Sequence, residues 1–177
     1  MDDHAGREHL ALGERIRAAR VEAGLSLSEV ARRAGVGKGT LSELEHGLRA
    51  PRLETLWALS TALGVPLGRF ATSDGATAAG AAVEPVLVDR WTSDAFYELY
   101  RGTVGPETQH SPAHAAGVTE VLTVITGRLE AGPEEALSTA GPGESIAFAG
   151  SAPHRYRAVQ TPCQVVIVIR YGSPPVG

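Results

Sequence analysis

The chain has few cysteine, lysine and aromatic residues, and it has no long apolar run. Among its 177 residues there is a single cysteine, Cys163, so it can form neither a disulfide framework nor a cage of several thiolate metal ligands. No apolar run approaches the roughly 20 residues that a membrane-spanning helix requires. The first four residues, MDDH, are acidic and polar, unlike the basic and then apolar order of a secretory signal. We therefore expect a cytoplasmic protein with no membrane partner.

The net charge is small and unevenly divided. The chain has a formal charge of −4, with ten basic and nine acidic residues in 1–71, and six basic and eleven acidic residues in 72–177. A protein that binds polyanions through bulk charge needs several cations facing the phosphates and a net charge that does not oppose them. The composition argues against that kind of binding, so any nucleic-acid site must be local.

The first 71 residues have apolar residues at spacings of three and four, which is typical of amphipathic helices. Ser26 stands three residues before Glu29, which is the capping-box arrangement of a helix start, and glycines follow most of the apolar stripes. Five short helices are expected, over residues 12–23, 27–34, 38–46, 53–63 and 66–70. Together they predict one all-helical domain over residues 8–71.

The second part of the chain has a different pattern. Residues 72–84 are rich in Ala, Gly, Thr and Ser and predict a linker. Beyond it, short β-branched and aromatic segments are separated by Gly and Pro. Strands are expected over residues 86–90, 96–104, 118–126, 145–149 and 163–171. Strands without helices between them predict an all-β sandwich or barrel over residues 85–177, so the fold class is α+β with two domains.

Two of the predicted helices, joined by a tight turn, form the unit that places a recognition helix in the DNA major groove. The stretches GLSLSEVA and TLSELEHG resemble the phage-repressor, or Xre-like, helix-turn-helix family, and the resemblance covers residues 10–70. It implies a DNA-binding transcriptional regulator whose recognition helix is 38–46. Arg20 and Glu45 match the positions of a structural ion pair in that family.

The resemblance and the outward positions of the second helix define the expected DNA-facing surface. It comprises Ser28, Lys38, Gly39, Thr40, Ser42, Glu43, His46, Arg49 and Arg52. Lys38 lies in a first helical turn, where the macrodipole disfavours a cation, and a phosphate or a guanine edge at that end would offset this effect. Glu43 can accept from a cytosine amine, or it is a solvated charge paired with a neighbour. Arg49 and Arg52 fit phosphate contacts that set the register on DNA.

A single helix-turn-helix buries little surface, and related domains bind two half-sites about 34 Å apart as dimers. The last predicted strand, 163–171, includes a run that is apolar on both faces, so a second sheet or a partner subunit must cover its outer face. We therefore expect a homodimer, formed through the barrel, that binds a pseudo-palindromic double-stranded DNA operator.

Two spacings in the second half resemble the motifs of the cupin family, whose fold is a double-stranded β-helix barrel. Six residues separate Glu120 from Gly127, and His154 follows Gly143 by eleven residues. The resemblance covers residues 84–172 and implies a cupin-type barrel that serves as a sensor domain.

The cupin resemblance also implies a site. His114, Glu120 and His154 match metal ligands and would form an open N,N,O site for a divalent metal, zinc or iron. Ala116 stands where the family has a further histidine, so at most three protein ligands remain. Tyr156 follows His154 by two residues and is expected to line the same pocket.

The position of Glu120 leaves an alternative to the metal open. Strand alternation places Glu120 on the same face as Leu122, toward the apolar interior, where a carboxylate requires a partner. If no metal supplies it, Arg101 or Arg128 is the expected partner, and His114 then lies exposed on its loop.

These observations lead to a regulator in which a small-molecule or metal effector, bound beside Glu120, His154 and Tyr156, shifts the dimer between arrangements that fit the operator or do not. No catalytic residue is assigned, and an enzyme is not expected. The alternative is a metal-dependent cupin enzyme, of oxygenase or isomerase type, that carries a DNA-binding module. A third hypothesis is an antitoxin-like DNA-binding protein, for which a sensor barrel would be superfluous.

Overall fold

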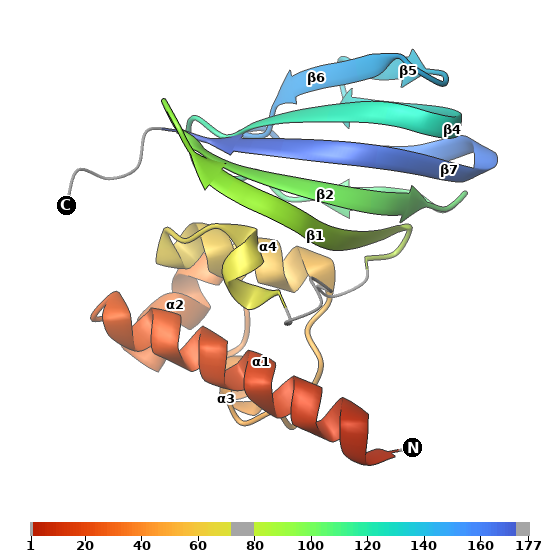
Figure 1. Ribbon diagram of the computed structural model, residues 1–177. Coiled ribbons are helices and arrows are strands. Elements are labelled where there is room, and N and C mark those ends of the chain that lie inside the picture. Colours follow the sequence, from red (N-terminus) through yellow and green to blue (C-terminus); the bar gives the residue numbers. More distant parts are fainter. Residues whose placement is uncertain (1, 72–79, 173–177) are drawn as a thin grey trace.

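The computed structural model describes residues 2–71 and 80–172. Helices form the lower part of the molecule in Figure 1, and a curved antiparallel sheet forms the upper part. The helices are α1 (Asp2–Glu22), α2 (Leu27–Ala34), α3 (Lys38–Glu45) and α4 (Leu53–Leu63), followed by a 3-10 turn (Leu67–Phe70). The strands are β1 (Val83–Thr92), β2 (Phe96–Val104), β3 (Gln109–Ser111), β4 (Thr119–Pro133), β5 (Ser138–Ala140), β6 (Ser145–Ala149) and β7 (His154–Tyr171).

The described helical part has four α-helices, so the prediction of five helices is wrong in its last member, and α1 begins at Asp2, ten residues before the predicted start. Leu67–Phe70 forms a 3-10 turn between extended residues on both sides, and four residues are too few for a stable α-helix. The capping box is confirmed, because the Ser26 hydroxyl accepts from the Glu29 amide and the Glu29 carboxylate accepts from the Ser26 amide, each at 3.2 Å. α3 ends at Glu45, one residue before the predicted end.

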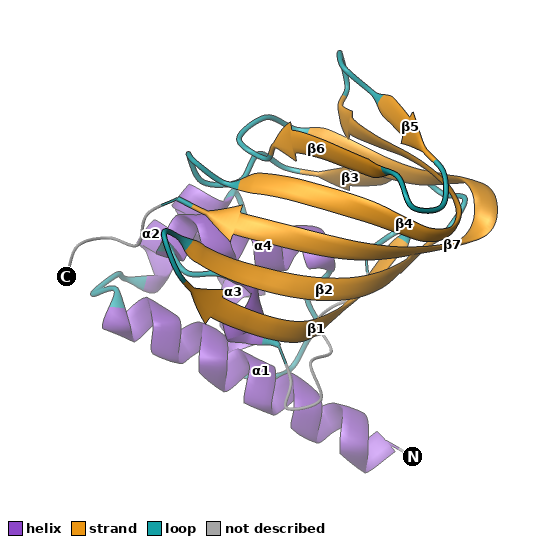
Figure 2. Ribbon diagram, turned by 45° about the horizontal axis from the view of Figure 1, so that its top comes forward, coloured by secondary structure: helices purple, strands orange, loops and turns teal. Residues whose placement is uncertain are grey.

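The sheet is a single one with the strand order β1-β2-β7-β4-β5, while β3 pairs with β7 and β6 pairs with β4. It curls into a half-barrel (Figure 2), because the long strands β4 and β7 shift register between Val124 and Leu129 and bend there. Both strands exceed the predicted lengths, and the three-residue strands β3 and β5 were missed. The predicted closed barrel is therefore a curled sheet with an open side.

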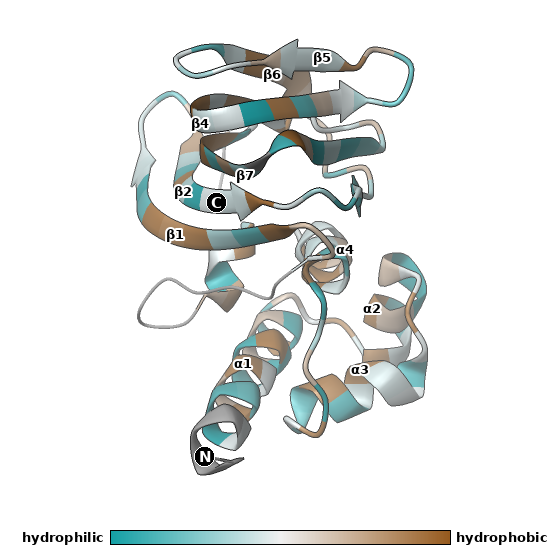
Figure 3. Cartoon of the chain, turned by 90° about the vertical axis from the view of Figure 1, so that its right-hand side faces the viewer, coloured by the Kyte–Doolittle hydropathy of each residue, from teal (hydrophilic) through white to brown (hydrophobic). Residues whose placement is uncertain are grey.

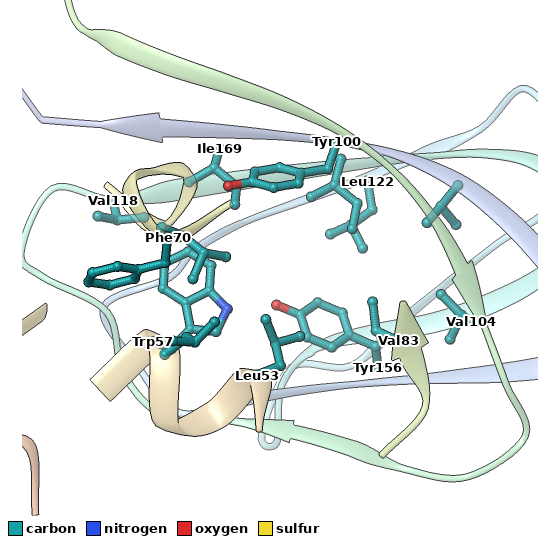
Figure 4. Close-up of a cluster of buried hydrophobic side chains, with 14 of the residues drawn as sticks. Leu53, Trp57, Phe70, Val83, Tyr100, Val104, Val118, Leu122, Tyr156 and Ile169 are labelled. Carbon is teal, nitrogen blue, oxygen red and sulfur yellow. The ribbon is translucent and has the colours of Figure 1, made fainter. Parts of the chain in front are cut away.

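Helix α4 covers the open side of the sheet and lies between it and the other helices (Figure 3). Leu53 and Trp57 of α4 and Phe70 of the 3-10 turn belong to the same buried apolar cluster as Tyr100 and Ile169 of the sheet (Figure 4). The helical part and the sheet therefore share one core.

The predicted linker, 72–84, falls mostly outside the described residues, and its last two residues, Val83 and Glu84, already belong to β1. None of the helices in the described part of the chain is both long and apolar enough to span a bilayer.

Candidate functional site

Helix α3 is held against α1 by a partly buried ion pair and by a close backbone contact. The Arg20 guanidinium donates to both carboxylate oxygens of Glu45, at 2.7 and 2.8 Å, as the family resemblance implied. A Cβ atom at Gly13 of α1 would lie 2.4 Å from the carbonyl oxygen of Leu44, so only glycine allows α1 to approach α3 this closely. The position of α3 is thus fixed by contacts on its inner side.

The outer side of α3 is free of contacts with the sheet. Leu41 and Leu44 point inward and are buried, and α3 lies on the side of the helical part away from the sheet (Figure 1). Of the nine residues predicted to face DNA, seven are exposed and two, Thr40 and Ser42, are half-buried. The exposed ones are Ser28, Lys38, Gly39, Glu43, His46, Arg49 and Arg52.

Polar groups on this surface make few strong contacts within the chain. The closest approach of Arg49 to Glu43 is 3.8 Å between two half-exposed side chains, which is a weak surface ion pair. His46 holds its Nδ1 atom 2.7 Å from the Ser42 carbonyl oxygen, which orients the ring at the end of α3. The surface can therefore offer cations and hydroxyls to phosphates and base edges.

A second group of predicted residues meets inside the curled sheet. The Glu120 carboxylate, on β4, accepts a hydrogen bond at 2.7 Å from His114 Nε2 and another at 2.7 Å from the Tyr156 hydroxyl. His154 Nε2 lies 3.3 Å from the same carboxylate. All four residues are buried. The structure thus brings together the three predicted metal ligands and the predicted pocket residue.

The alternative in which arginine neutralises Glu120 is wrong. Arg101 and Arg128 are exposed, whereas His114 is only 5% exposed and contacts Glu120 directly. His110, which precedes His114 by four residues, is exposed and lies 3.5 Å from Glu134. Histidine rings, rather than a guanidinium, are therefore the partners of this carboxylate.

Charge in this cluster is set by the histidines. Burial alone would raise the pKa of Glu120, but the contacts with His114 and His154 outweigh it and lower the pKa to about 2. Burial would likewise lower the pKa of His154, and the Glu120 carboxylate instead raises it above the ordinary value. Glu120 is therefore a carboxylate at neutral pH despite its burial.

The donor set fits a divalent metal. One ligand atom each from His114, Glu120 and His154 lie within 4.8 Å of one another. His154 Nδ1 is held 2.8 Å from the Ala152 carbonyl oxygen, which fixes the ring and leaves Nε2 as the metal-binding atom. Among the described residues, this Nε2 atom has no hydrogen-bond partner although it is buried. Two imidazoles and one carboxylate are ligands for zinc or iron.

Trp57 covers this cluster from the helical side, and this contact was not predicted from the sequence. Its ring stacks on the His114 ring, with centroids 3.6 Å apart and planes 20° apart. The cavity that remains beside Glu120 and Tyr156 measures about 30 Å³. This volume holds about one or two water molecules. The interior therefore has no room for an organic effector while α4 is in place.

A second buried carboxylate, Glu98 on β2, was also missed. It accepts from the Gly68 amide at 2.9 Å, from the Tyr100 hydroxyl at 2.8 Å and from the Tyr171 hydroxyl at 2.6 Å. The Leu67 amide in turn donates to Tyr171, at 3.0 Å. Burial raises the pKa of Glu98, against these three donors. This network fastens the 3-10 turn to the sheet. The sequence signal that could have found Glu98 is strand alternation, which places it on the same inward face of β2 as Tyr100.

The comparisons with known proteins agree with this arrangement. Residues 16–70 match the HTH_3 helix-turn-helix family. The chain is 30% identical over 146 residues to the HTH-type transcriptional regulator SutR of Escherichia coli K12, spanning 78% of this chain and 82% of that protein. This chain belongs to the HTH_3, or Xre-type, family of transcriptional regulators. α2 and α3 are therefore the helix-turn-helix of an HTH_3 regulator.

Other matches of this HTH_3 regulator cover different parts of the chain. The phage CTXphi repressor RstR of Vibrio cholerae is 43% identical over 63 residues, which are 36% of this chain and 56% of RstR. A crystal structure of an HTH_3 family regulator from Vibrio cholerae covers 94% of this chain and 98% of its own, with a TM-score of 0.85 at 24% identity. A cupin_2 domain of an XRE family regulator from Enterobacter cloacae covers 52% of this chain and 98% of its own, at 26% identity and a TM-score of 0.45. The full-length match shows that the fold includes both the helical part and the sheet.

Proposed function

We propose that this HTH_3 regulator binds a DNA operator through α3 as a homodimer, and that a ligand bound at the sheet modulates this binding. The main support for DNA binding is the outer face of α3, which is polar and uncovered and lies within the region that matches the family. Lys38, Arg49 and Arg52 are exposed cations at or beyond the two ends of this helix, where a duplex would place its phosphates.

The outer face of the sheet supports the proposed homodimer. Register places Leu99 of β2, Val168 of β7 and Val121 of β4 side by side, and all three are half-buried. Val88 and Ile125 are large apolar residues that are 56% and 53% exposed. Apolar residues on three adjacent strands, with Val88 and Ile125 exposed nearby on the sheet, favour a protein partner, and a second copy would give the two-fold symmetry that a pseudo-palindromic operator requires.

The His114, Glu120 and His154 cluster supports a metal as part of the sensor. A bound zinc or iron ion would supply a positive charge that attracts anions and polarises a bound ligand. Tyr156 would keep its hydrogen bond to Glu120 and orient that carboxylate. This use of the cluster requires no catalytic residue.

A metal-dependent enzyme is the second candidate, and the N,N,O donor set favours it. An enzyme of this kind needs space for an organic substrate next to the metal. The cavity beside Glu120 measures about 30 Å³, and the pockets of about 350 and 500 Å³ that His114 and His154 line are not lined by Glu120, so none of them is bordered by all three ligands. The regulator therefore agrees better with the geometry.

The test begins with selection of DNA fragments that the purified protein binds. With the selected operator, we expect Lys38→Ala combined with Arg49→Ala to weaken binding about 10- to 100-fold and to reduce the slope of log affinity against log salt by up to about two. A matched control, Arg101→Ala combined with Arg128→Ala, removes two exposed charges from the sheet. Equal affinity of the two double variants would contradict the proposed DNA surface.

A further inference from the structure

A pocket lies at the junction between the helical part and the sheet. It measures about 350 Å³, against about 30 Å³ for the cavity beside Glu120. Trp57 and Gly64 of the helical part line one side, and Phe96, His114 and Tyr171 line the other. Figure 4 shows the Trp57 ring reaching from α4 toward the sheet. A volume of this size is at the lower end of known small-molecule sites.

The walls of this junction pocket define the chemistry of its ligand. Among the described residues that line it there is no Asp, Glu, Lys or Arg. His114 is the one histidine among these described lining residues, and its Nε2 atom is hydrogen-bonded to Glu120 inside the sheet, so any charge on its ring is already opposed by that carboxylate. A charged ligand would therefore lose its hydration without gaining an unpaired opposite charge, and a neutral ligand is favoured. Trp57, Phe96 and Tyr171 provide aromatic faces, while Thr61 and Thr92 provide hydroxyl groups. A flat aromatic molecule with one polar group can pack against the aromatic faces and form a hydrogen bond with a hydroxyl group.

The junction pocket also touches the elements that the proposed function needs to connect. Trp57 stacks on His114, and His114 donates to Glu120, so one wall of the pocket is shared with the buried cluster. The same Trp57 belongs to α4, which packs against α2 of the helix-turn-helix. A ligand in this pocket contacts the sheet and the DNA-binding part at once.

We propose that the junction pocket, rather than the interior of the sheet, binds the effector, and that this effector is a neutral aromatic molecule with one hydroxyl or N–H group. Its binding changes the position of α4 against the sheet and thereby the affinity for the operator. This second step rests on the proposed function, whereas ligand binding itself does not.

The binding test uses the protein without DNA. The chain has two tryptophans, and Trp91 is 40% exposed and lies outside the pocket lining, so Trp91→Phe leaves Trp57 as the single indole N–H signal in a ¹⁵N NMR spectrum. Titration with indole should shift this signal with a Kd of about 1 mM or tighter. Indole-3-carboxylate, which carries a charge, should bind at least about tenfold more weakly.

Two alanine-to-phenylalanine variants test whether indole binds in the junction pocket. Ala116 is exposed and lines the pocket, so Ala116→Phe fills it without entering the core, whereas Ala147→Phe adds the same ring to an exposed position on β6. In the Trp91→Phe background, Ala116→Phe should weaken indole binding at least about tenfold and Ala147→Phe should not. No saturable shift with indole, or equal binding by both variants, would overturn the site, and equal binding of the carboxylate would overturn the neutral ligand.

Operator binding tests the coupling separately. Indole should change the operator affinity of the wild-type protein at least about threefold and leave that of Ala116→Phe unchanged. Indole binding without a change in operator affinity would overturn the coupling and keep the site. Failure of the wild-type protein to bind any DNA would overturn the proposed function, while the NMR result would still decide the pocket.

Discussion

The two buried carboxylates of the sheet, Glu98 and Glu120, are equally hidden from water but have different partners. Glu98 is 0% exposed and accepts from two tyrosine hydroxyls and a backbone amide, whereas Glu120 is 1% exposed and faces two histidines. Burial raises the pKa of Glu98, and the histidines lower that of Glu120 to about 2. Depth alone therefore does not decide the charge of a buried acid; the charge of its neighbours does.

The largest expected difference between these two acids appears when each is replaced by its amide. Glu120→Gln removes the buried carboxylate that His114 and His154 face and should lower the free energy of unfolding at pH 7 by about 3–5 kcal/mol. Glu98→Gln keeps one acceptor for the Gly68 amide and should lower it by about 1–2 kcal/mol. Urea unfolding in the presence of a chelator measures both.

This pair of variants has an internal check, because both substitutions preserve the shape of the side chain. Circular dichroism and the urea dependence of unfolding should be the same as in the wild-type protein. If Glu98→Gln were as destabilising as Glu120→Gln, the difference in partner charge would not explain the two sites.

A change of pH should alter the contributions of the two acids to the stability of the protein in opposite directions. A carboxyl whose pKa falls from 4.5 to about 2 on folding gives stability that is present above about pH 4.5 and is lost as the pH falls toward 2, on the order of 3 kcal/mol for Glu120. Glu98, whose pKa is raised, gives its stability at low pH and loses it as the pH rises through the folded value. The stabilities of both variants relative to wild type should therefore be measured at pH 3, 5 and 7.

The expected pattern is specific to each variant. The deficit of Glu120→Gln should shrink by about 2 kcal/mol between pH 5 and pH 3, below the titration of His154, because the wild-type protein there loses the stability that the ionised Glu120 provides. The deficit of Glu98→Gln should grow over the same range. His154, whose pKa is raised by Glu120, gives its stability fully below pH 6.5 and loses it as the pH rises above its folded value. A deficit of Glu120→Gln that did not change with pH would refute its assignment as a carboxylate held by histidines.

The helix-turn-helix was predictable from the sequence because its signals are local. The Ser26 and Glu29 capping box and the glycines after the helices act within a few residues, and the structure has the α2 and α3 starts at the predicted positions. The Arg20 and Glu45 pair came from the family resemblance and is confirmed. The fifth helix failed because the 3-10 turn at Leu67–Phe70 is set by contacts with Glu98 and Tyr171, which are distant in sequence.

The buried cluster was predictable only in part. The cupin resemblance implied His114, Glu120 and His154, and strand alternation added Tyr156 to the same face as His154; the structure brings the four residues together. No local pattern could show that α4 covers the open side of the sheet, because Trp57 has the spacing of an ordinary inward helix residue. The role of the interior as an effector pocket therefore stays a prediction from family resemblance, and the cavity beside Glu120 measures about 30 Å³.

The smallest expected effect comes from removing one tyrosine hydrogen bond at each of the two carboxylates. Tyr156→Phe removes the hydroxyl that donates to Glu120 at 2.7 Å, and Tyr100→Phe removes the one that donates to Glu98 at 2.8 Å. A hydrogen bond to a charged group contributes about 1.5–3 kcal/mol and one to a neutral group about 0.5–1.5 kcal/mol. We therefore expect Tyr156→Phe to lower the free energy of unfolding by more than Tyr100→Phe, because Glu120 is ionised whereas burial disfavours the charged form of Glu98. Repeating the measurement on Glu120→Gln and Glu98→Gln backgrounds gives the coupling energy of each pair, which should be larger for Tyr156 because its acceptor carries the full charge.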